Sequence, residues 1–148
     1  MDLPSHLKDL THNIIGCLIR VHRKLGPGLL ESIYRRCSAY ELKQAGFRVE
    51  EERWIPLEYG DLKFDCAYRI DLVINELVVL EIKAVERLDP VHGAQLLTYL
   101  RLTGCPVGLL VNFNAAVLKN GIKRFINLPD NLSMIDGPRS QAPFSAPR

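Results

Sequence analysis

Apolar residues recur at intervals of three and four along the first third of the chain, and this spacing predicts two amphipathic helices. The first covers about residues 7–24 and ends at the Gly26-Pro27-Gly28 turn. The second runs from about Leu29 to Gln44 and stops before Gly46. The apolar side of the first helix is formed by Leu7, Leu10, Ile14, Leu18 and Val21.

The middle of the chain has the alternation and the turn residues of extended structure. We expect one strand over Phe47–Glu58, a turn at Tyr59–Leu62 and a second strand over Lys63–Ile74. Asn75-Glu76 separates the latter from the segment Leu77–Lys83, whose start is almost entirely apolar. Such a run is typical of a central strand that is buried on both faces, and a hairpin is the natural connection to it.

A third helix is expected over Pro90–Thr103, followed by a buried strand over Val107–Asn112 and a short edge strand over Ile122–Asn127. The order of elements predicts an α/β fold in which helices flank a mixed β-sheet. Beyond Leu128 the chain is rich in Pro, Ser, Gln and Arg, so we expect one domain over residues 1–128 and a flexible tail over 129–148.

Composition narrows the function only slightly. The formal net charge of +2 over 148 residues is too small to indicate nucleic-acid binding by itself. The N-terminus lacks the pattern of a secretory signal and no apolar run is long enough to span a bilayer, so a cytoplasmic protein without membrane contact is expected. Cys17, Cys37, Cys66 and Cys105 lie too far apart for a zinc or iron–sulfur motif, and we expect them to be reduced and buried.

Three ionisable residues interrupt the two central strands: Asp71, Glu81 and Lys83. Buried charges must be paired or bound to a metal. Alternate residues of a strand share a face, so Glu81 and Lys83 project together while Ile82 offers its carbonyl oxygen. Two carboxylates and a carbonyl form a hard-oxygen site that suits Mg²⁺ or Mn²⁺, and Lys83 beside it would orient or help to deprotonate an attacking water.

This hypothesis depends on the length of the connection between the two strands. A two-residue turn at Asn75-Glu76 would pair Asp71 with Leu80 and turn the Asp71 carboxylate away from Glu81. A three-residue loop or a β-bulge is therefore required. A structural ion pair among Asp71, Glu81 and Lys83 is the simpler alternative, because a Glu-x-Lys triplet is common.

The remaining charged and aromatic residues carry weaker signals. His92 is expected to be a surface or capping residue of the third helix and not a catalytic group. Glu31 is either a solvated or ion-paired helix residue or a functional carboxylate, and a position in the first turn of a helix favours a carboxylate through the helix dipole. Tyr34 and Tyr99 are as consistent with core aromatics as with site residues. The scattered basic residues are expected to be solvated charges and not phosphate contacts, with a nucleic-acid groove near the site as the open alternative for some of them: Lys63, Arg69, Arg87, Arg101, Lys119, Lys123 and Arg124.

Taken together, several segments resemble one known family. They are Gly26–Glu31 with Tyr34, Tyr68–Leu72, Glu81–Val85, Gln95–Leu100 and Val111–Asn114. The chain resembles the GxxExxY family of small bacterial and archaeal proteins, which is assigned to the PD-(D/E)XK nuclease superfamily, over about Ile14–Ile126. The resemblance implies a restriction-endonuclease-like core and a metal-dependent nuclease acting on DNA or RNA.

The resemblance also implies roles for single residues. Asp71, Glu81, the Ile82 carbonyl and Glu31 would hold the metal, Lys83 would act at the nucleophile and Gln95 would face the site, with Tyr34 and Tyr99 in support. Two other functions stay open. One is a nuclease fold that binds nucleic acid or a protein without cutting. The other is an accessory subunit that forms a homodimer or a larger complex.

Overall fold

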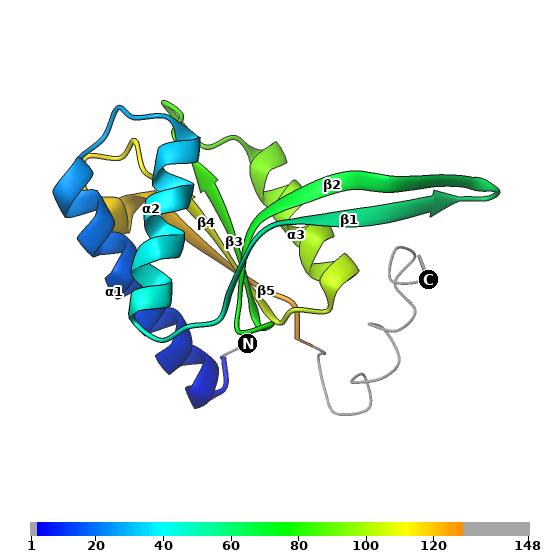
Figure 1. Ribbon diagram of the computed structural model, residues 1–148, viewed down its shortest axis with the longest axis horizontal. Coiled ribbons are helices and arrows are strands. Elements are labelled where there is room, and N and C mark those ends of the chain that lie inside the picture. The colour runs from blue at the N-terminus through cyan, green and yellow to red at the C-terminus, as the bar shows by residue number, and fades with distance from the viewer. Residues whose placement is uncertain (1–2, 129–148) are drawn as a thin grey trace.

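The computed structural model describes residues 3–128, so the predicted flexible tail over 129–148 lies outside the described residues. Figure 1 shows how the elements are arranged. In chain order they are α1 (Ser5–Leu25), α2 (Glu31–Gln44), β1 (Val49–Tyr59), β2 (Leu62–Ile74), β3 (Val78–Lys83), α3 (Pro90–Thr103), β4 (Val107–Asn112), the short 3₁₀ helix η1 (Leu118–Gly121) and β5 (Ile122–Ile126).

The five strands form one mixed sheet in the order β1-β2-β3-β4-β5. The pairs β1–β2, β2–β3 and β4–β5 are antiparallel, whereas β3 and β4 are parallel and are joined through α3. A parallel pair needs such a crossover connection, because a short turn cannot return the chain to the same end of the sheet. The expected α/β architecture, a mixed sheet with flanking helices, is therefore confirmed.

Helices cover the two faces of the sheet and create two separate apolar cores. On one face α1 and α2 pack against Leu72, Leu80 and Ile82. On the other face α3 packs against Val73, Val79 and Leu110 through residues such as Leu96 and Leu100. All six residues of β4 and five of the six residues of β3 are buried. Their near-continuous apolar sequences predicted this burial.

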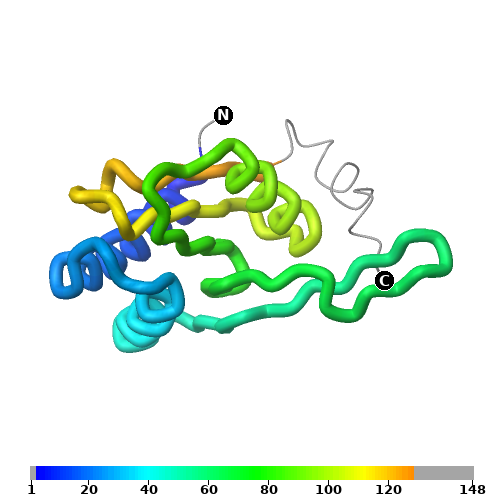
Figure 2. Tube along the Cα trace, turned by 90° about the horizontal axis from the view of Figure 1, so that it is seen from above, coloured from blue at the N-terminus to red at the C-terminus, as the bar shows by residue number. Residues whose placement is uncertain are grey.

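The β1–β2 hairpin extends well beyond this layered core, as Figures 1 and 2 show. Pairing between β2 and β3 covers only Leu72–Ile74, so the rest of β2 has β1 as its ladder partner. Near the hairpin tip Leu57 pairs with Phe64 and Tyr59 with Leu62. These pairs place four apolar side chains on one face of the ribbon.

Differences from the sequence prediction are small, and each has a local cause. Helix α2 begins at Glu31 and not at Leu29, because Gly28 has a φ of 101° and Leu30 is still extended. Cys17 and Cys105 are buried as expected, whereas Cys66 is exposed on the projecting part of β2, so the expectation of burial was wrong for Cys66. Within residues 3–128 no helix has both the length and the apolar character needed to cross a membrane.

Candidate active site

The connection between β2 and β3 fulfils the geometric condition that the site requires. Leu72 pairs with Leu80 and Ile74 with Val78, which leaves a three-residue loop, residues 75–77. Asn75 and Glu76 both have positive φ, 53° and 56°, and the Leu77 amide closes the turn on the Ile74 carbonyl at 3.0 Å. If the same register is continued one residue beyond the Leu72–Leu80 pair, Asp71 lies opposite Glu81, and the two side chains share a face of the sheet.

Asp71 and Glu81 are held together by the backbone of the strands that carry them. The Asp71 amide donates to Glu81 Oε1 at 3.0 Å, and the Ile82 amide donates to Asp71 Oδ2 at 2.8 Å. Backbone pairing between β2 and β3 ends at Leu72 and Leu80. Beyond that pair, these two bonds from backbone amides to carboxylates connect the strands. Only 6% of Asp71 and 5% of Glu81 is exposed.

Burial of two neighbouring carboxyl groups changes how they bind protons. Burial, followed by the negative charge of Asp71, raises the pKa of Glu81 to about 8. The pKa of Asp71 is also raised by burial, although the Ile82 amide and the charges of Arg69, Lys83 and Arg35 oppose this rise. A cation placed between the two carboxylates would offset the cost of holding two negative charges there.

Two arginines and a glutamate extend the site toward β1. Arg69 Nη2 lies 3.1 Å from Asp71 Oδ1, and Arg69 Nη1 lies 2.6 Å from Glu52 Oε2. Arg35 of α2 approaches the other oxygen of Glu52, with Nη2 3.7 Å from Oε1. The interpretation of Arg69 as a solvated charge was therefore wrong. The sequence offered one clue that was missed, since Arg69 lies two residues before Asp71 on a strand.

Glu31 and Lys83 lie at the end of β3 that bears Glu81. Glu31 Oε2 accepts a hydrogen bond from the Ala84 amide at 3.2 Å, directly after Lys83. Lys83 is half-buried and lies close enough to Asp71 and Glu81 for its charge to lower the pKa of both. Within the described part of the chain no three His, Cys, Asp or Glu side chains are gathered closely enough to hold a metal, so Glu31 does not complete a three-carboxylate set with the acid pair.

Asn112, which sequence reasoning did not single out, fixes the segment that follows Lys83. This buried residue at the end of β4 donates to the Val85 carbonyl at 2.9 Å and accepts from the Val85 amide at 3.0 Å. Its Oδ1 also accepts from the Asn114 amide at 3.2 Å. The signal that could have identified it is an asparagine at the end of a buried apolar strand, because a buried amide must be satisfied.

Tyr34 belongs to the core, one of the two interpretations left open for it. The residue is fully buried, its ring stacks on Phe113 with centroids 4.5 Å apart, and its hydroxyl donates to the Gly26 carbonyl. The same hydroxyl accepts from the Leu29 amide at 3.1 Å. Tyr34 therefore holds the Gly26–Gly28 turn against α2 and thereby positions the start of the helix that carries Glu31.

We expect Tyr34→Phe to lower the free energy of unfolding by about 1–3 kcal/mol, because the backbone groups of Gly26 and Leu29 would lose their partner. Urea denaturation followed by circular dichroism would measure this change. Tyr40→Phe is the matched control, since Tyr40 lies on the same helix and is 64% exposed. Equal stabilities of the two variants would contradict the structural role of the Tyr34 hydroxyl.

From α3, Tyr99 lies near the acid pair, whereas Gln95 has no recorded contact with Asp71 or Glu81. Tyr99 is buried and meets Tyr68 edge to face at 5.9 Å, and burial and the charges of Glu81 and Asp71 raise its pKa to about 12. Gln95 is exposed one helical turn before Tyr99 and so shares its face. His92 caps the start of α3, where its Nδ1 accepts from the Asp89 amide at 3.0 Å, which confirms the expected capping role.

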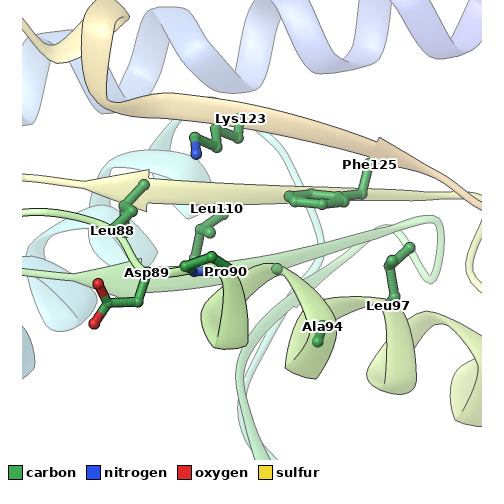
Figure 3. A pocket seen from close by; sticks show the side chains of 9 residues that line it. Leu88, Asp89, Pro90, Ala94, Leu97, Leu110, Lys123 and Phe125 are labelled. Carbon is green, nitrogen blue, oxygen red and sulfur yellow. The ribbon is translucent and has the colours of Figure 1, made fainter.

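A separate hollow of about 450 Å³ lies between α3 and the β4–β5 part of the sheet. Figure 3 shows Pro90, Ala94 and Leu97 of α3 beside it, with Leu110, Lys123 and Phe125 on the strands. Gly93 permits this arrangement, because a Cβ there would lie 2.8 Å from Phe125 Cζ. None of the residues of the acid pair lines this hollow.

The chemistry of the donor atoms at Asp71 and Glu81 fits a divalent cation. Both side chains supply hard oxygen ligands, and Glu81 uses only Oε1 in its bond to the Asp71 amide. The amide and the carbonyl of a strand residue point to the same side of the strand. The Ile82 amide donates a hydrogen bond to Asp71 Oδ2, so the Ile82 carbonyl is expected on the Asp71 side as well. Two carboxylates and one carbonyl leave positions for water and substrate oxygen, as Mg²⁺ requires.

One of the comparisons with known proteins found a match. No curated protein and no solved structure matches the chain. The family model described as the PD-(D/E)XK nuclease superfamily matches residues 8–125, a span that includes Asp71, Glu81 and Lys83 together with all five strands. A mixed five-stranded sheet with flanking helices is consistent with the restriction-endonuclease-like fold of that superfamily. The chain belongs to the PD-(D/E)XK nuclease superfamily.

Proposed function

We propose that the protein is a metal-dependent nuclease that hydrolyses phosphodiester bonds in DNA or RNA, with Mg²⁺ or Mn²⁺ as its ion. The single observation that carries this proposal is the pair of buried carboxyl groups, each held by a backbone amide of the other's strand, with Lys83 beside them at the end of a central strand. Residues 28–34 also carry the Gly28, Glu31 and Tyr34 pattern, and on it we place the chain in the GxxExxY family.

The proposed ligands are Asp71, Glu81 and the Ile82 carbonyl, and Glu31 would contribute through a water molecule from the start of α2. When bound, a divalent cation supplies charge neutralisation at the phosphate and lowers the pKa of a bound water. The Asp71 and Ile82 amides fix the two carboxylates, so that little reorganisation is needed on binding.

Other side chains would position the reacting groups. Lys83 donates N–H hydrogen bonds to the attacking water or to a phosphate oxygen, and thereby holds the water in line with the bond to be broken. Tyr99 stays protonated at neutral pH and keeps a hydroxyl donor next to the acid pair. Gln95, exposed on the same helix face as Tyr99, is proposed to contact the substrate.

The test is cleavage of a panel of end-labelled single- and double-stranded DNA and RNA, with Mg²⁺, with Mn²⁺ and with EDTA. We expect the protein to cleave at least one polymer in the presence of Mg²⁺ or Mn²⁺ and not in EDTA. The Asp71→Asn variant, whose side chain has the same size, should not cleave it. Lys63→Ala is the matched control, because Lys63 is exposed on the projecting hairpin and pairs with Glu58 there.

Cleavage that survives Asp71→Asn would come from a contaminating enzyme and would contradict the proposal. Absence of cleavage across the panel, together with retained binding of one polymer, would instead assign a binding module that uses the nuclease fold without cutting.

A further inference from the structure

Arg35 has unused hydrogen-bonding capacity at a buried position beside the acid pair. Its side chain is only 13% exposed, and its Nε is buried without a hydrogen-bond partner among the described residues. The contact with Glu52 Oε1 is long, 3.7 Å from Nη2. Buried polar groups are nearly always satisfied, so an unpartnered guanidinium nitrogen calls for a ligand.

Glu52 lies between Arg35 and a second arginine. Its Oε2 is 2.6 Å from Arg69 Nη1, while its Oε1 faces Arg35. The carboxylate itself is 42% exposed, and the residue has a φ of 55°, in the left-handed region that non-glycine residues rarely adopt. Two arginines on different elements, α2 and β2, therefore converge on one solvent-accessible anion.

Both arginines, Arg35 and Arg69, also interact with Asp71. Arg69 bridges Glu52 and Asp71, since its Nη2 lies 3.1 Å from Asp71 Oδ1. Arg35 is close enough to Asp71 for its charge to lower the pKa of that carboxyl group. The two guanidinium groups thus flank the proposed metal ligands on the β1 side, whereas Lys83 lies at the end of β3.

We propose that Arg35 and Arg69 form a phosphate subsite for the polynucleotide phosphate next to the one that is cleaved, and that Glu52 occupies this subsite in the free protein. The substrate class rests on the proposed nuclease function. Guanidinium groups bind phosphate oxygens through paired hydrogen bonds, as they bind carboxylates. An incoming phosphate would displace the Glu52 carboxylate and would accept hydrogen bonds from the guanidinium groups of both arginines.

The test measures binding without cleavage, in EDTA, by fluorescence anisotropy of a labelled 20-nucleotide single strand and of its duplex across a range of NaCl concentrations. We expect Arg35→Gln to weaken binding about fivefold to tenfold and to reduce the slope of log K against log salt by about one phosphate contact. Arg35→Lys keeps the charge and should lose less affinity.

Arg36→Gln is the matched control. Arg36 is the next residue of α2, its side chain is 74% exposed and it faces Glu51 at 3.9 Å, so the substitution should leave affinity and slope unchanged. Glu52→Gln removes the competing charge while keeping the size of the side chain, and we expect it to tighten binding about threefold or more. This gain cannot come from misfolding.

The outcomes separate the subsite from the catalytic proposal. If the wild-type protein cleaves, and Arg35→Gln and Glu52→Gln both bind like it, the subsite is wrong and the nuclease proposal stands. If binding changes as expected without any cleavage, Arg35 and Arg69 bind a nucleic-acid phosphate, but no cleaved phosphate lies next to it and the nuclease proposal fails. If the wild-type protein neither binds nor cleaves any polymer, both are overturned.

Discussion

Replacing Lys83 with alanine is expected to lower the single-turnover cleavage rate about 1,000-fold while leaving the affinity for Mn²⁺ within about twofold. Lys83 is not among the oxygen ligands, and its proposed role is to hold the attacking water, for which positioned proton-transfer groups contribute about 10²–10⁴ in rate. Glu81→Ala should differ in kind, because it removes a ligand and should weaken Mn²⁺ binding as well as cleavage.

Single-turnover kinetics and calorimetric titration with Mn²⁺ would separate the two effects. Lys43→Ala is a suitable control, since Lys43 lies at the far end of α2 and pairs with Glu51 at 3.1 Å. A Lys83→Ala protein that loses metal affinity as strongly as Glu81→Ala would assign Lys83 to the integrity of the site and not to the chemical step.

Without divalent ions, the protein is expected to become less stable as the pH rises from about 4.5 to about 8. The pKa of Glu81 is about 8 in the fold, against an ordinary value of 4.5. Between these values the folded protein holds a proton that the unfolded chain has released, so this stabilisation is complete below pH 4.5 and is lost as the pH passes through 8. Each pKa unit corresponds to about 1.4 kcal/mol, so we expect a loss of about 4–5 kcal/mol, measured by urea denaturation in EDTA.

Glu81→Gln tests the origin of this pH dependence. A glutamine cannot ionise, and its carbonyl can still accept from the Asp71 amide, so the variant should be about as stable as the wild type near pH 5 and more stable by about 4–5 kcal/mol near pH 9. Mn²⁺ should stabilise the wild-type protein more at pH 8 than at pH 5, because metal ligands must be deprotonated. A pH dependence that persists unchanged in Glu81→Gln would locate its source elsewhere.

Local patterns in the sequence predicted the elements and the central chemistry because each depends on near neighbours in the chain. The apolar run before Glu81 marked a buried strand, and the three charges within buried strands marked the site. The sequence even specified the condition on which Asp71 and Glu81 could meet. It did not choose between a loop and a bulge, because left-handed backbone at Asn75 and Glu76 depends on how the two strands twist.

The arginine–glutamate network escaped prediction for a different reason. Arg35, Glu52 and Arg69 come from three elements, and their contacts exist only once α2 packs beside β1 and β2. A charged residue on an amphipathic helix or a strand appears solvated when the sequence alone is considered. Tyr34 likewise had two acceptable interpretations, and only the path of the Gly26–Gly28 turn decided between them.

Strand β2 has two ends with opposite tolerance to changes in length. At residues 75–77, loss or gain of one residue would shift the register and turn Asp71 to the other face. At Gly60-Asp61, beyond the last contact with β3, residues could be removed from β1 and β2 in cross-strand pairs without moving the acid pair.

Amide hydrogens in that outer hairpin should exchange through local fraying, while those of β3 and β4 exchange only when the whole sheet opens. Natural variants of this chain should therefore differ in hairpin length while keeping a three-residue turn before β3.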